Sequence, residues 1–293
     1  MDLRQSPQWG NYLKALGWES VYLDSGVAVR IRRLGPLAVL KIQRPEVLDE
    51  GVLREILALR KKYRGFLTKI EPLNLITDQE PLLKKYRFRL DNWPLSVSKT
   101  IVIGLTPSEE EILARFSKDG RYCLRRAEKN GLTVKSVIPD LTGHRTVPVL
   151  IRDPGMGDFY KLFSETSRRG HFWVPSLTEL KNKMAAFDQE ALIFLAYQNS
   201  LPVAGALVLI YDKTAYYLHA GSTLEGQKLE APYLIVWEII KKAKELGCTK
   251  LDLEGIYDPR FKAATKNWQS FTIFKHKFGG EEIPFPGAFS RYF

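Results

Sequence analysis

Residues 215–256 read AYYLHAGSTLEGQKLEAPYLIVWEIIKKAKELGCTKLDLEGI, and this stretch decides the fold class. The aromatic and aliphatic run at 214–222 is typical of a β-strand. Residues 231–247 repeat apolar side chains at helical spacing and end at Gly247, a common C-terminal stop. Residues 250–256 predict a second strand. A strand, a helix and a strand in succession predict a mixed α/β architecture.

The same alternation extends over the rest of the chain. Apolar runs bounded by turn residues predict further strands at 35–42, 65–72, 99–105, 133–138, 191–198, 202–211 and 270–278. Helical spacing predicts helices at 46–64, from about 107, from about 120 to 130, at 157–167 and at 176–187. Thr106 is the expected cap of the helix near 107, because the Glu109 side chain can hydrogen-bond back to the Thr106 N–H in a capping box. Residues 199–202 are expected to form a hairpin turn.

These elements fall into two successive units of similar type, with no low-complexity linker between them. We expect one domain at 1–95 and a larger one at 96–280. A two-lobed molecule with a cleft between the lobes is the simplest arrangement, because ligand sites favour domain interfaces.

The composition is that of an ordinary globular protein with a basic bias. The chain has 293 residues, 45% of them hydrophobic, and 44 Lys+Arg against 33 Asp+Glu give a net charge of +11. A chain of this length can bury a core without disulfides or metal staples. Cys123 and Cys248 are the only cysteines, and with four histidines they make no zinc spacing. We therefore expect no metal site and a reducing compartment.

The N-terminal residues lack the basic and apolar segments of a signal peptide, and no window approaches about 18 uninterrupted apolar residues. We therefore expect a cytoplasmic protein. The basic excess favours an anionic partner: nucleic acid, a phosphorylated substrate, or peripheral contact with an anionic membrane. Charge alone leaves these three open.

Five segments, distributed over most of the chain, carry a family resemblance. They are QSPQWGNYLKALGW (5–18), EEEILARFSKDGRYCLRRAEKNGLTV (109–134), FYKLFSETSRRGHF (159–172), the stretch at 215–256, and NWQSFTIFKHKFGG (267–280). Together they resemble the Fem family of tRNA-dependent aminoacyl transferases, which build peptidoglycan cross-bridges. The resemblance implies two tandem Gcn5-related N-acyltransferase-like domains, with residues 281–293 returning to the first.

The resemblance also implies the reaction. An amino acid would pass from aminoacyl-tRNA to a side-chain amine on the stem peptide of a peptidoglycan precursor, which is nucleotide-linked or lipid-linked. No cofactor is implied. Aminolysis of an ester needs an unprotonated amine, stabilisation of a tetrahedral oxyanion and a proton for the departing ribose hydroxyl.

Lys275 is the candidate catalytic residue. If 270–278 is a strand, alternation places Lys275 on one face with Phe271 and Ile273 and places Phe274 on the other. The family has a Phe-Lys pair here, matched by Phe274 and Lys275, and the resemblance implies that its lysine binds substrate and steadies the oxyanion. On pattern alone, a solvated lysine at an exposed strand end is the simpler interpretation of Lys275.

Several residues match positions that the resemblance assigns to the substrate. Lys14 would contact the precursor phosphates, although a solvated helix face explains it on pattern alone. Arg168 and Arg169 match an arginine-bearing segment, and either would supply charge because Val174 stands where some members have a basic residue. Both are also ordinary for a protein surface.

Three further residues are candidate substrate contacts. Tyr217 and His219 lie two apart in one predicted strand, so we expect them on the same sheet face, where either could hydrogen-bond the stem peptide. A core tyrosine and a satisfied histidine are the simpler interpretations. Glu71 matches a carboxylate near the family's cleft. Asp252 and Glu254 also share a face of the 250–256 strand, and no general base is singled out.

A basic stripe is expected on the helix that continues to residue 130. Lys118, Arg121, Arg125 and Lys129 are spaced for one helix face, unless Gly120 interrupts it. The stripe could bind tRNA phosphates or simply be solvated.

Two other functions compete with aminoacyl transfer. An acyl-CoA-dependent N-acyltransferase of the same fold would need a glycine-rich pyrophosphate loop, but residues 227–232 place Glu230 and Pro232 where the glycines should be. A non-catalytic RNA-binding protein would account for the charge alone.

Overall fold

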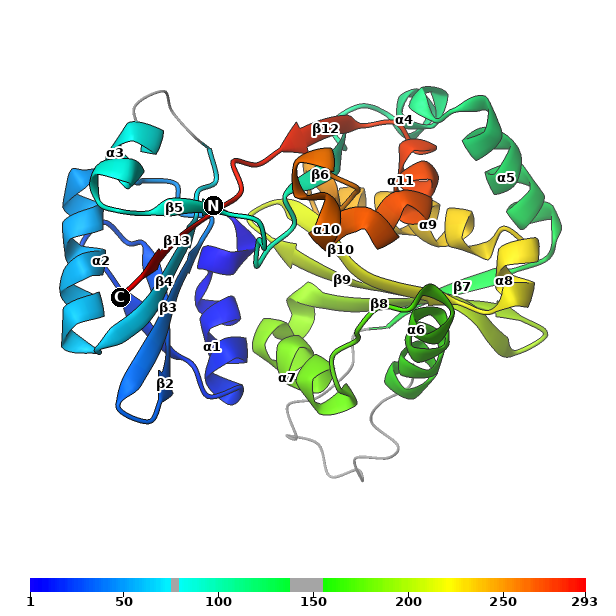
Figure 1. The fold of residues 1–293 in the computed structure, drawn as a ribbon. Helices are drawn as coiled ribbons and strands as arrows, with labels where there is room; N and C mark the ends of the chain where they lie inside the picture. Colours follow the sequence, from blue (N-terminus) through cyan, green and yellow to red (C-terminus); the bar gives the residue numbers. More distant parts are fainter. Residues whose placement is uncertain (75–78, 138–154) are drawn as a thin grey trace. The chain divides into compact units, whose positions relative to one another are not determined.

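The computed structural model describes residues 1–74, 79–137 and 155–293, and its contacts divide the chain into two compact units (Figure 1). Unit 1 holds Met1–Lys99, Asp258–Lys266 and Pro284–Phe293, and unit 2 holds Thr100–Tyr257 and Asn267–Ile283. The sequence-based boundary after residue 95 stays a prediction. Residues 258–266, which that boundary placed in the second domain, group with unit 1. Arg260 Nη2 donates to Ser98 O at 3.1 Å, which fastens this segment there.

Unit 1 is built on a six-stranded sheet in the order β1-β2-β3-β4-β13-β5. β3 and β4 run parallel, and every other neighbouring pair is antiparallel. The strands are β1 (Glu19–Tyr22), β2 (Ala28–Leu34), β3 (Leu37–Gln43), β4 (Gly65–Glu71), β5 (Arg89–Asp91) and β13 (Ala288–Tyr292).

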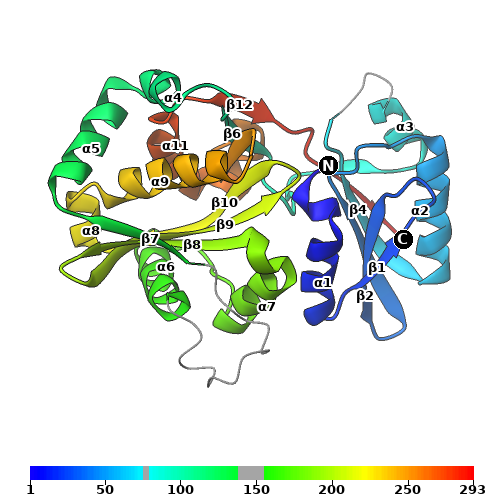
Figure 2. The same cartoon turned by 180° about the vertical axis from the view of Figure 1, so that it is seen from behind.

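Two helices cover the two faces of this sheet (Figure 2). The crossover helix α2 (Glu50–Lys62) begins where the Asp49 side chain accepts the Val52 N–H at 2.8 Å, and it buries Val52 and Ile56 in the core. α1 (Pro7–Ala15) lies on the other face, where Arg30 Nη2 donates to Ser6 O at 2.9 Å. The remaining helices of unit 1 are η1 (Leu3–Gln5), α3 (Gln79–Lys85), η3 (Pro259–Phe261) and α10 (Lys262–Thr265).

Unit 2 is built on a seven-stranded sheet in the order β12-β6-β11-β10-β9-β8-β7. The parallel pair β10 and β11 is joined by α9 (Ala231–Glu245), so the predicted strand–helix–strand stretch is confirmed. The strands are β6 (Lys99–Gly104), β7 (Thr133–Val137), β8 (Ala191–Gln198), β9 (Leu201–Tyr211), β10 (Thr214–Ser222), β11 (Lys250–Gly255) and β12 (Glu281–Pro284).

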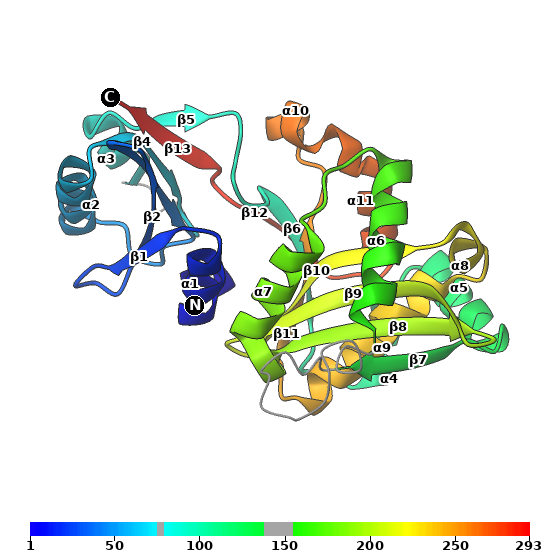
Figure 3. The ribbon, with the colours of Figure 1, turned by 90° about the horizontal axis from the view of Figure 1, so that it is seen from below.

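Helices cover both faces of the second sheet, with α6 (Met156–Gly170) on one and α9 on the other (Figure 3). Phe116 packs edge to face on Trp237 of α9 and on Phe278, with ring centroids 5.8 and 5.2 Å apart. Such pairs contribute about 0.5–1.5 kcal/mol beyond their buried area. The other helices are α4 (Glu109–Arg115), α5 (Lys118–Lys129), α7 (Leu177–Phe187), η2 (Asp188–Glu190), α8 (Leu224–Lys228), η4 (Lys266–Trp268) and α11 (Gln269–His276).

The predicted hairpin between β8 and β9 is confirmed. Asn199 and Ser200 have φ of 48° and 68°, the left-handed conformation that two-residue hairpin turns require. Two local predictions are wrong. The cap of α4 is Ser108, whose side chain forms a capping box with Glu111, so the helix begins later than the Thr106 cap would place it.

The strand predicted at 270–278 is also wrong, because helix α11 runs from Gln269 to His276 and the last two residues lie in the turn after it. The β-branched and aromatic content of this segment favours a strand, but the phenylalanines also fit helical spacing. Phe274 and Phe278 lie four residues apart and pack with ring centroids 4.9 Å apart. Packing on the unit 2 core therefore overrides local propensity.

No helix in the described part of the chain is both long enough and apolar enough to cross a lipid bilayer.

Candidate functional site

The end of β11 is irregular and carries two buried carboxylates, Asp252 and Glu254. The pairing of β11 with β6 shifts register between Asp252 and Gly255, and Glu254 has φ of 59°. The Asp252 carboxylate accepts the Glu254 N–H at 2.7 Å and hydrogen-bonds the Thr100 hydroxyl. A side chain at positive φ is strained, and such residues cluster at functional sites. We therefore take this bulge as the centre of the candidate site.

Lys275 of α11 lies at this bulge. Its Nζ donates to Gly255 O at 2.7 Å. Burial lowers the pKa of Lys275 to about 8, while the Glu254 and Asp252 carboxylates act in the opposite direction. The ammonium therefore persists at neutral pH and is lost in mildly alkaline solution. A group of this kind can stabilise a developing oxyanion and can also exchange a proton.

Phe274 fastens the helix that carries Lys275. Its ring packs on Tyr233 at 5.1 Å and on Phe278. The strand alternation that grouped Lys275 with Ile273 is wrong, since helix α11 leaves Ile273 64% exposed. Lys277 lies elsewhere, with Nζ 4.0 Å from Asp119 Oδ2, and it gives a natural control for Lys275.

Tyr217 and His219 do not share a sheet face as predicted. The register between β10 and β9 shifts between them, and this bulge reverses the alternation. Tyr217 is buried in the core cluster that includes the residues of α9, where burial raises the pKa of its hydroxyl.

His219 packs on Phe163 of α6, with ring centroids 5.0 Å apart, and its Nε2 lies 3.2 Å from Lys183 Nζ. Burial, reinforced by Lys183, holds the pKa of His219 well below its usual range. The imidazole is therefore neutral at neutral pH. Sequence reasoning missed Lys183, although a signal existed: it lies on the α7 face that also buries Leu180 and Met184.

The two arginines of α6 differ in their surroundings. Arg169 pairs with Glu165 at 2.6 Å and also hydrogen-bonds Thr166 and Ser222 O, which ties α6 to the end of β10. Arg168 is exposed, with Nε 3.4 Å from Ser164 O. Arg168 therefore presents its charge to solvent more fully than Arg169 does.

Glu71 and Lys14 belong to unit 1. Glu71 is buried at the end of β4 and accepts hydrogen bonds from the Ser96 N–H at 3.0 Å, the Ser96 hydroxyl at 2.6 Å and the Leu95 N–H. This carboxylate is already occupied in fixing a loop. Lys14 is exposed in the last turn of α1.

The predicted basic stripe lies on one uninterrupted helix. Lys118, Arg121, Arg125 and Lys129 all belong to α5, and Gly120 lies inside its first turn. A Cβ at Gly120 would come within 2.4 Å of Lys277 O, so the glycine is needed for this close approach. Arg121 donates to Ala114 O at 3.0 Å and to Phe116 O, whereas the other three members are exposed.

Residues 227–232, the segment compared with a pyrophosphate loop, span the end of α8 and the start of α9. Glu230 has φ of 61° and lies 3.5 Å from Arg126. Across the described ranges, no group of three or more His, Cys, Asp or Glu side chains is arranged to hold a metal ion.

Comparison of the sequence with known proteins shows its family. The sequence model of the FemAB family matches residues 95–200 and 177–293, which together span most of the chain. No curated protein sequence matches.

Three solved structures are similar in fold. FemX superposes with a TM-score of 0.79 at 18% identity, over 100% of this chain and 92% of that chain. The C-terminal domain of a putative lysylphosphatidylglycerol synthetase from Agrobacterium fabrum has a TM-score of 0.65 at 14% identity, over 98% and 88%. A tandem GNAT protein from the clavulanic acid biosynthesis pathway has a TM-score of 0.51 at 10% identity, over 91% and 78%. The predicted α/β fold of two tandem acyltransferase-like domains is confirmed.

Proposed function

Because the chain belongs to the FemAB family, a family of transferases, we propose that it moves an amino acid from aminoacyl-tRNA to the side-chain amine of a peptidoglycan-precursor stem peptide. The observation that carries the proposal is the position of Lys275. Its ammonium lies at a strained bulge, hydrogen-bonded to Gly255 O, with a pKa of about 8.

The reaction makes one amide bond and breaks one ester bond. The unprotonated acceptor amine attacks the ester carbonyl, the carbonyl oxygen becomes an oxyanion, and the ribose hydroxyl leaves with a proton. We assign Lys275 to the oxyanion, because a buried ammonium acts strongly on charge that develops in the transition state. No protein group is assigned as the base.

The contacts divide the remaining candidates by task. Lys14 and Arg168 are exposed, and we propose that they contact the precursor phosphates. Arg169 and Phe274 already have protein partners within unit 2, and we propose that they position the residues of that unit. We propose that Glu71 does the same for the loop of unit 1 that it holds. The proposed roles of Tyr217 and His219 in binding the stem peptide need a displacement of their core neighbours, so we rank these two last.

The α5 stripe is the proposed tRNA contact, through Lys118, Arg125 and Lys129. We place the reaction in the cytoplasm, where both substrates would be made. A lipid-linked acceptor would bring the basic chain to an anionic membrane surface.

Product analysis tests the proposal. The chain is incubated with a mixture of charged tRNAs and with nucleotide-linked or lipid-linked precursor, and the precursor is weighed by mass spectrometry. We expect a mass increase of one amino acid residue, dependent on charged tRNA. Transfer of an acetyl group from acetyl-CoA would favour the N-acyltransferase alternative. Binding of tRNA without any product would favour the RNA-binding alternative.

A further inference from the structure

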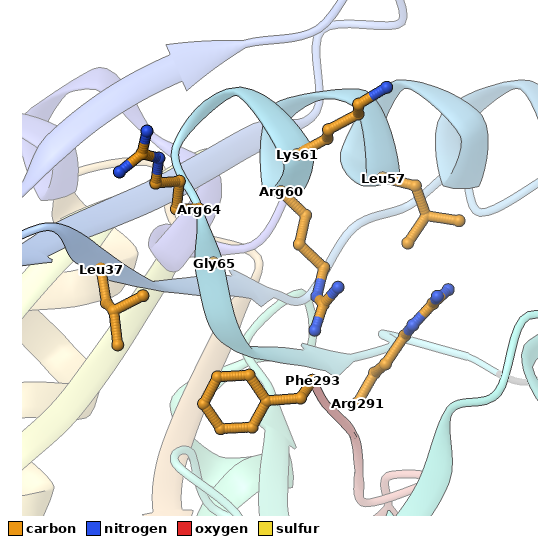
Figure 4. Close-up of a pocket in the computed structure, with 8 residues that line it drawn as sticks. All are labelled: Leu37, Leu57, Arg60, Lys61, Arg64, Gly65, Arg291 and Phe293. Atoms are coloured by element: carbon orange, nitrogen blue, oxygen red, sulfur yellow. The ribbon is translucent and has the colours of Figure 1, made fainter.

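Unit 1 contains a cavity of about 420 Å³ at the point where α2 ends and β4 begins (Figure 4). We call it the α2–β4 pocket. It is lined by residues of α2, of the starts of β3 and β4, and of the end of β13: Leu37, Leu57, Arg60, Lys61, Arg64, Gly65, Arg291 and Phe293. Its volume falls within the range of small-molecule sites.

Four of these side chains are cations, and no Asp or Glu is among the lining residues. The Arg60 side chain runs from α2 toward Arg291 and Phe293 (Figure 4). Burial and the neighbouring Arg291 charge both lower the pKa of Arg60. Lys61 and Arg64 are exposed and lie at the rim. The side chains that line the pocket therefore carry a net positive charge.

The hydrogen-bond donors of Arg60 are not fully used. Its Nε and Nη2 atoms are buried and have no hydrogen-bond partner among the residues that the structure describes. Arg291, in contrast, donates to Tyr86 O at 2.9 Å. Buried donors without partners are costly, so an acceptor that reaches Arg60 would stabilise the site.

Gly65 leaves room for two neighbouring side chains. A Cβ at this position would lie 2.6 Å from Leu40 Cδ1 and 3.0 Å from Arg60 Cγ. Arg64, at φ of 52°, adopts the left-handed conformation that glycine favours.

A simpler explanation is that the basic residues compensate the α2 dipole. Arg60, Lys61 and Lys62 all lie in the last helical turn, where cations are stabilising. That explanation does not account for Arg291, which comes from β13 and adds repulsion to Arg60. Lys62 belongs to the same helical turn but does not line the pocket. A Lys62 variant therefore tests the helix-dipole explanation separately from phosphate binding.

We propose that the α2–β4 pocket binds the phosphate group of a small organic phosphate. The free Arg60 donors and the Arg291 guanidinium would hold phosphate oxygens, since guanidinium forks match phosphate geometry. Leu37, Leu57 and Phe293 would cover the organic part. The site is independent of the aminoacyl-transfer proposal, because none of the residues that line the pocket has a role in that proposal.

Calorimetric titration of the full chain tests this proposal. The probes are inorganic phosphate, adenosine 5′-monophosphate and uncharged adenosine. We expect saturable binding of the monophosphate and none of adenosine. Binding of inorganic phosphate with equal affinity would identify the free anion as the ligand, whereas weaker binding would identify the organic phosphate.

Variants locate the binding. Arg60→Gln should weaken monophosphate binding about tenfold or more, because charged hydrogen bonds are lost. Arg291→Gln tests the same pair if Arg60→Gln does not fold. Lys62→Gln removes the same charge outside the pocket and should change affinity less than about twofold.

Three results would overturn the proposal. They are the absence of saturable binding by either phosphate probe, an equal loss in Lys62→Gln and Arg60→Gln, and affinity for tRNA alone. An equal loss in both variants would mean that the basic residues only compensate the α2 dipole. Affinity for tRNA alone would mean that they belong to a nucleic-acid-binding surface.

Discussion

Lys275 in unit 2 and Arg60 in unit 1 are both cations with buried polar atoms, but their neighbours differ. Lys275 donates to a backbone acceptor at 2.7 Å and is attracted by the carboxylates of Glu254 and Asp252. Arg60 has hydrogen-bond donors without partners among the described residues and is repelled by a second arginine, Arg291. A cation whose charge is already balanced by acceptors in the protein needs no bound anion, and it is available to stabilise negative charge that develops in a transition state. A cation without such compensation favours a ligand that brings its own negative charge.

The largest expected effect belongs to Lys275. Lys275→Met keeps the apolar stem and removes the ammonium. Turnover should fall about 100-fold to 1,000-fold, which corresponds to roughly 3–4 kcal/mol, because one oxyanion donor is lost. Steady-state kinetics with charged tRNA and precursor measure this.

The matched control for Lys275→Met is Lys277→Met. Lys277 lies in the same segment, but its Nζ is directed to Asp119 at 4.0 Å. Its replacement should change turnover by less than about threefold, as expected for a weak ion pair whose carboxylate is exposed. Equal losses in both variants would remove the distinction on which the site rests.

The α5 stripe extends the comparison to exposed cations. A triple variant, Lys118→Gln, Arg125→Gln and Lys129→Gln, should weaken tRNA binding and lower the slope of log affinity against log salt by about 2 to 3, because about three counterions are no longer released. Binding is measured by filter retention over a range of salt concentrations. An unchanged salt slope would show that the stripe is only a solvated face.

Arg121 should give the smallest functional effect of the basic residues on α5. Its guanidinium caps the end of α4 through Ala114 O and Phe116 O. Arg121→Gln should lower the free energy of unfolding by about 1–2 kcal/mol and leave the tRNA salt slope nearly unchanged. Denaturant unfolding and the same binding assay check the two parts. If Arg121→Gln lost as much tRNA affinity as the triple variant, Arg121 would be a tRNA contact like the other three basic residues.

Much of the fold was predictable because its patterns are local. The apolar run at 191–198 coincides with β8, and Asn199 with Ser200 makes the expected turn. α11 was not predictable in this way, since a short aromatic segment suits both a strand and a helix until its packing is known. Phe274 and Phe278 settle the choice by contacting the core.

The role of Lys275 stays a prediction, and the sequence said little about the geometry around it. Lys275 was found through a family resemblance, while its neighbours depend on two bulges that no periodicity reveals. The β10 bulge separates Tyr217 from His219, and the β11 bulge brings Asp252 to the Glu254 N–H. A bulge adds one residue to a strand. Because helices cover both faces of this sheet, the apolar pattern does not mark the extra residue, and strict alternation assigns the following side chains to the wrong face.

The pH dependence of the Lys275→Met effect tests the central claim most directly. Only the charged form of Lys275 can stabilise an oxyanion, and its pKa of about 8 means that this form is present at neutral pH and is lost as the pH rises. Single-turnover rates of the unmodified chain and of Lys275→Met are compared between pH 6.5 and pH 9.5, since ionisation of the acceptor amine then cancels from the ratio. We expect the rate ratio to be constant below about pH 7.5 and to fall about tenfold per pH unit above pH 8. A ratio that stays constant over the whole range would contradict the assignment of Lys275 to the oxyanion.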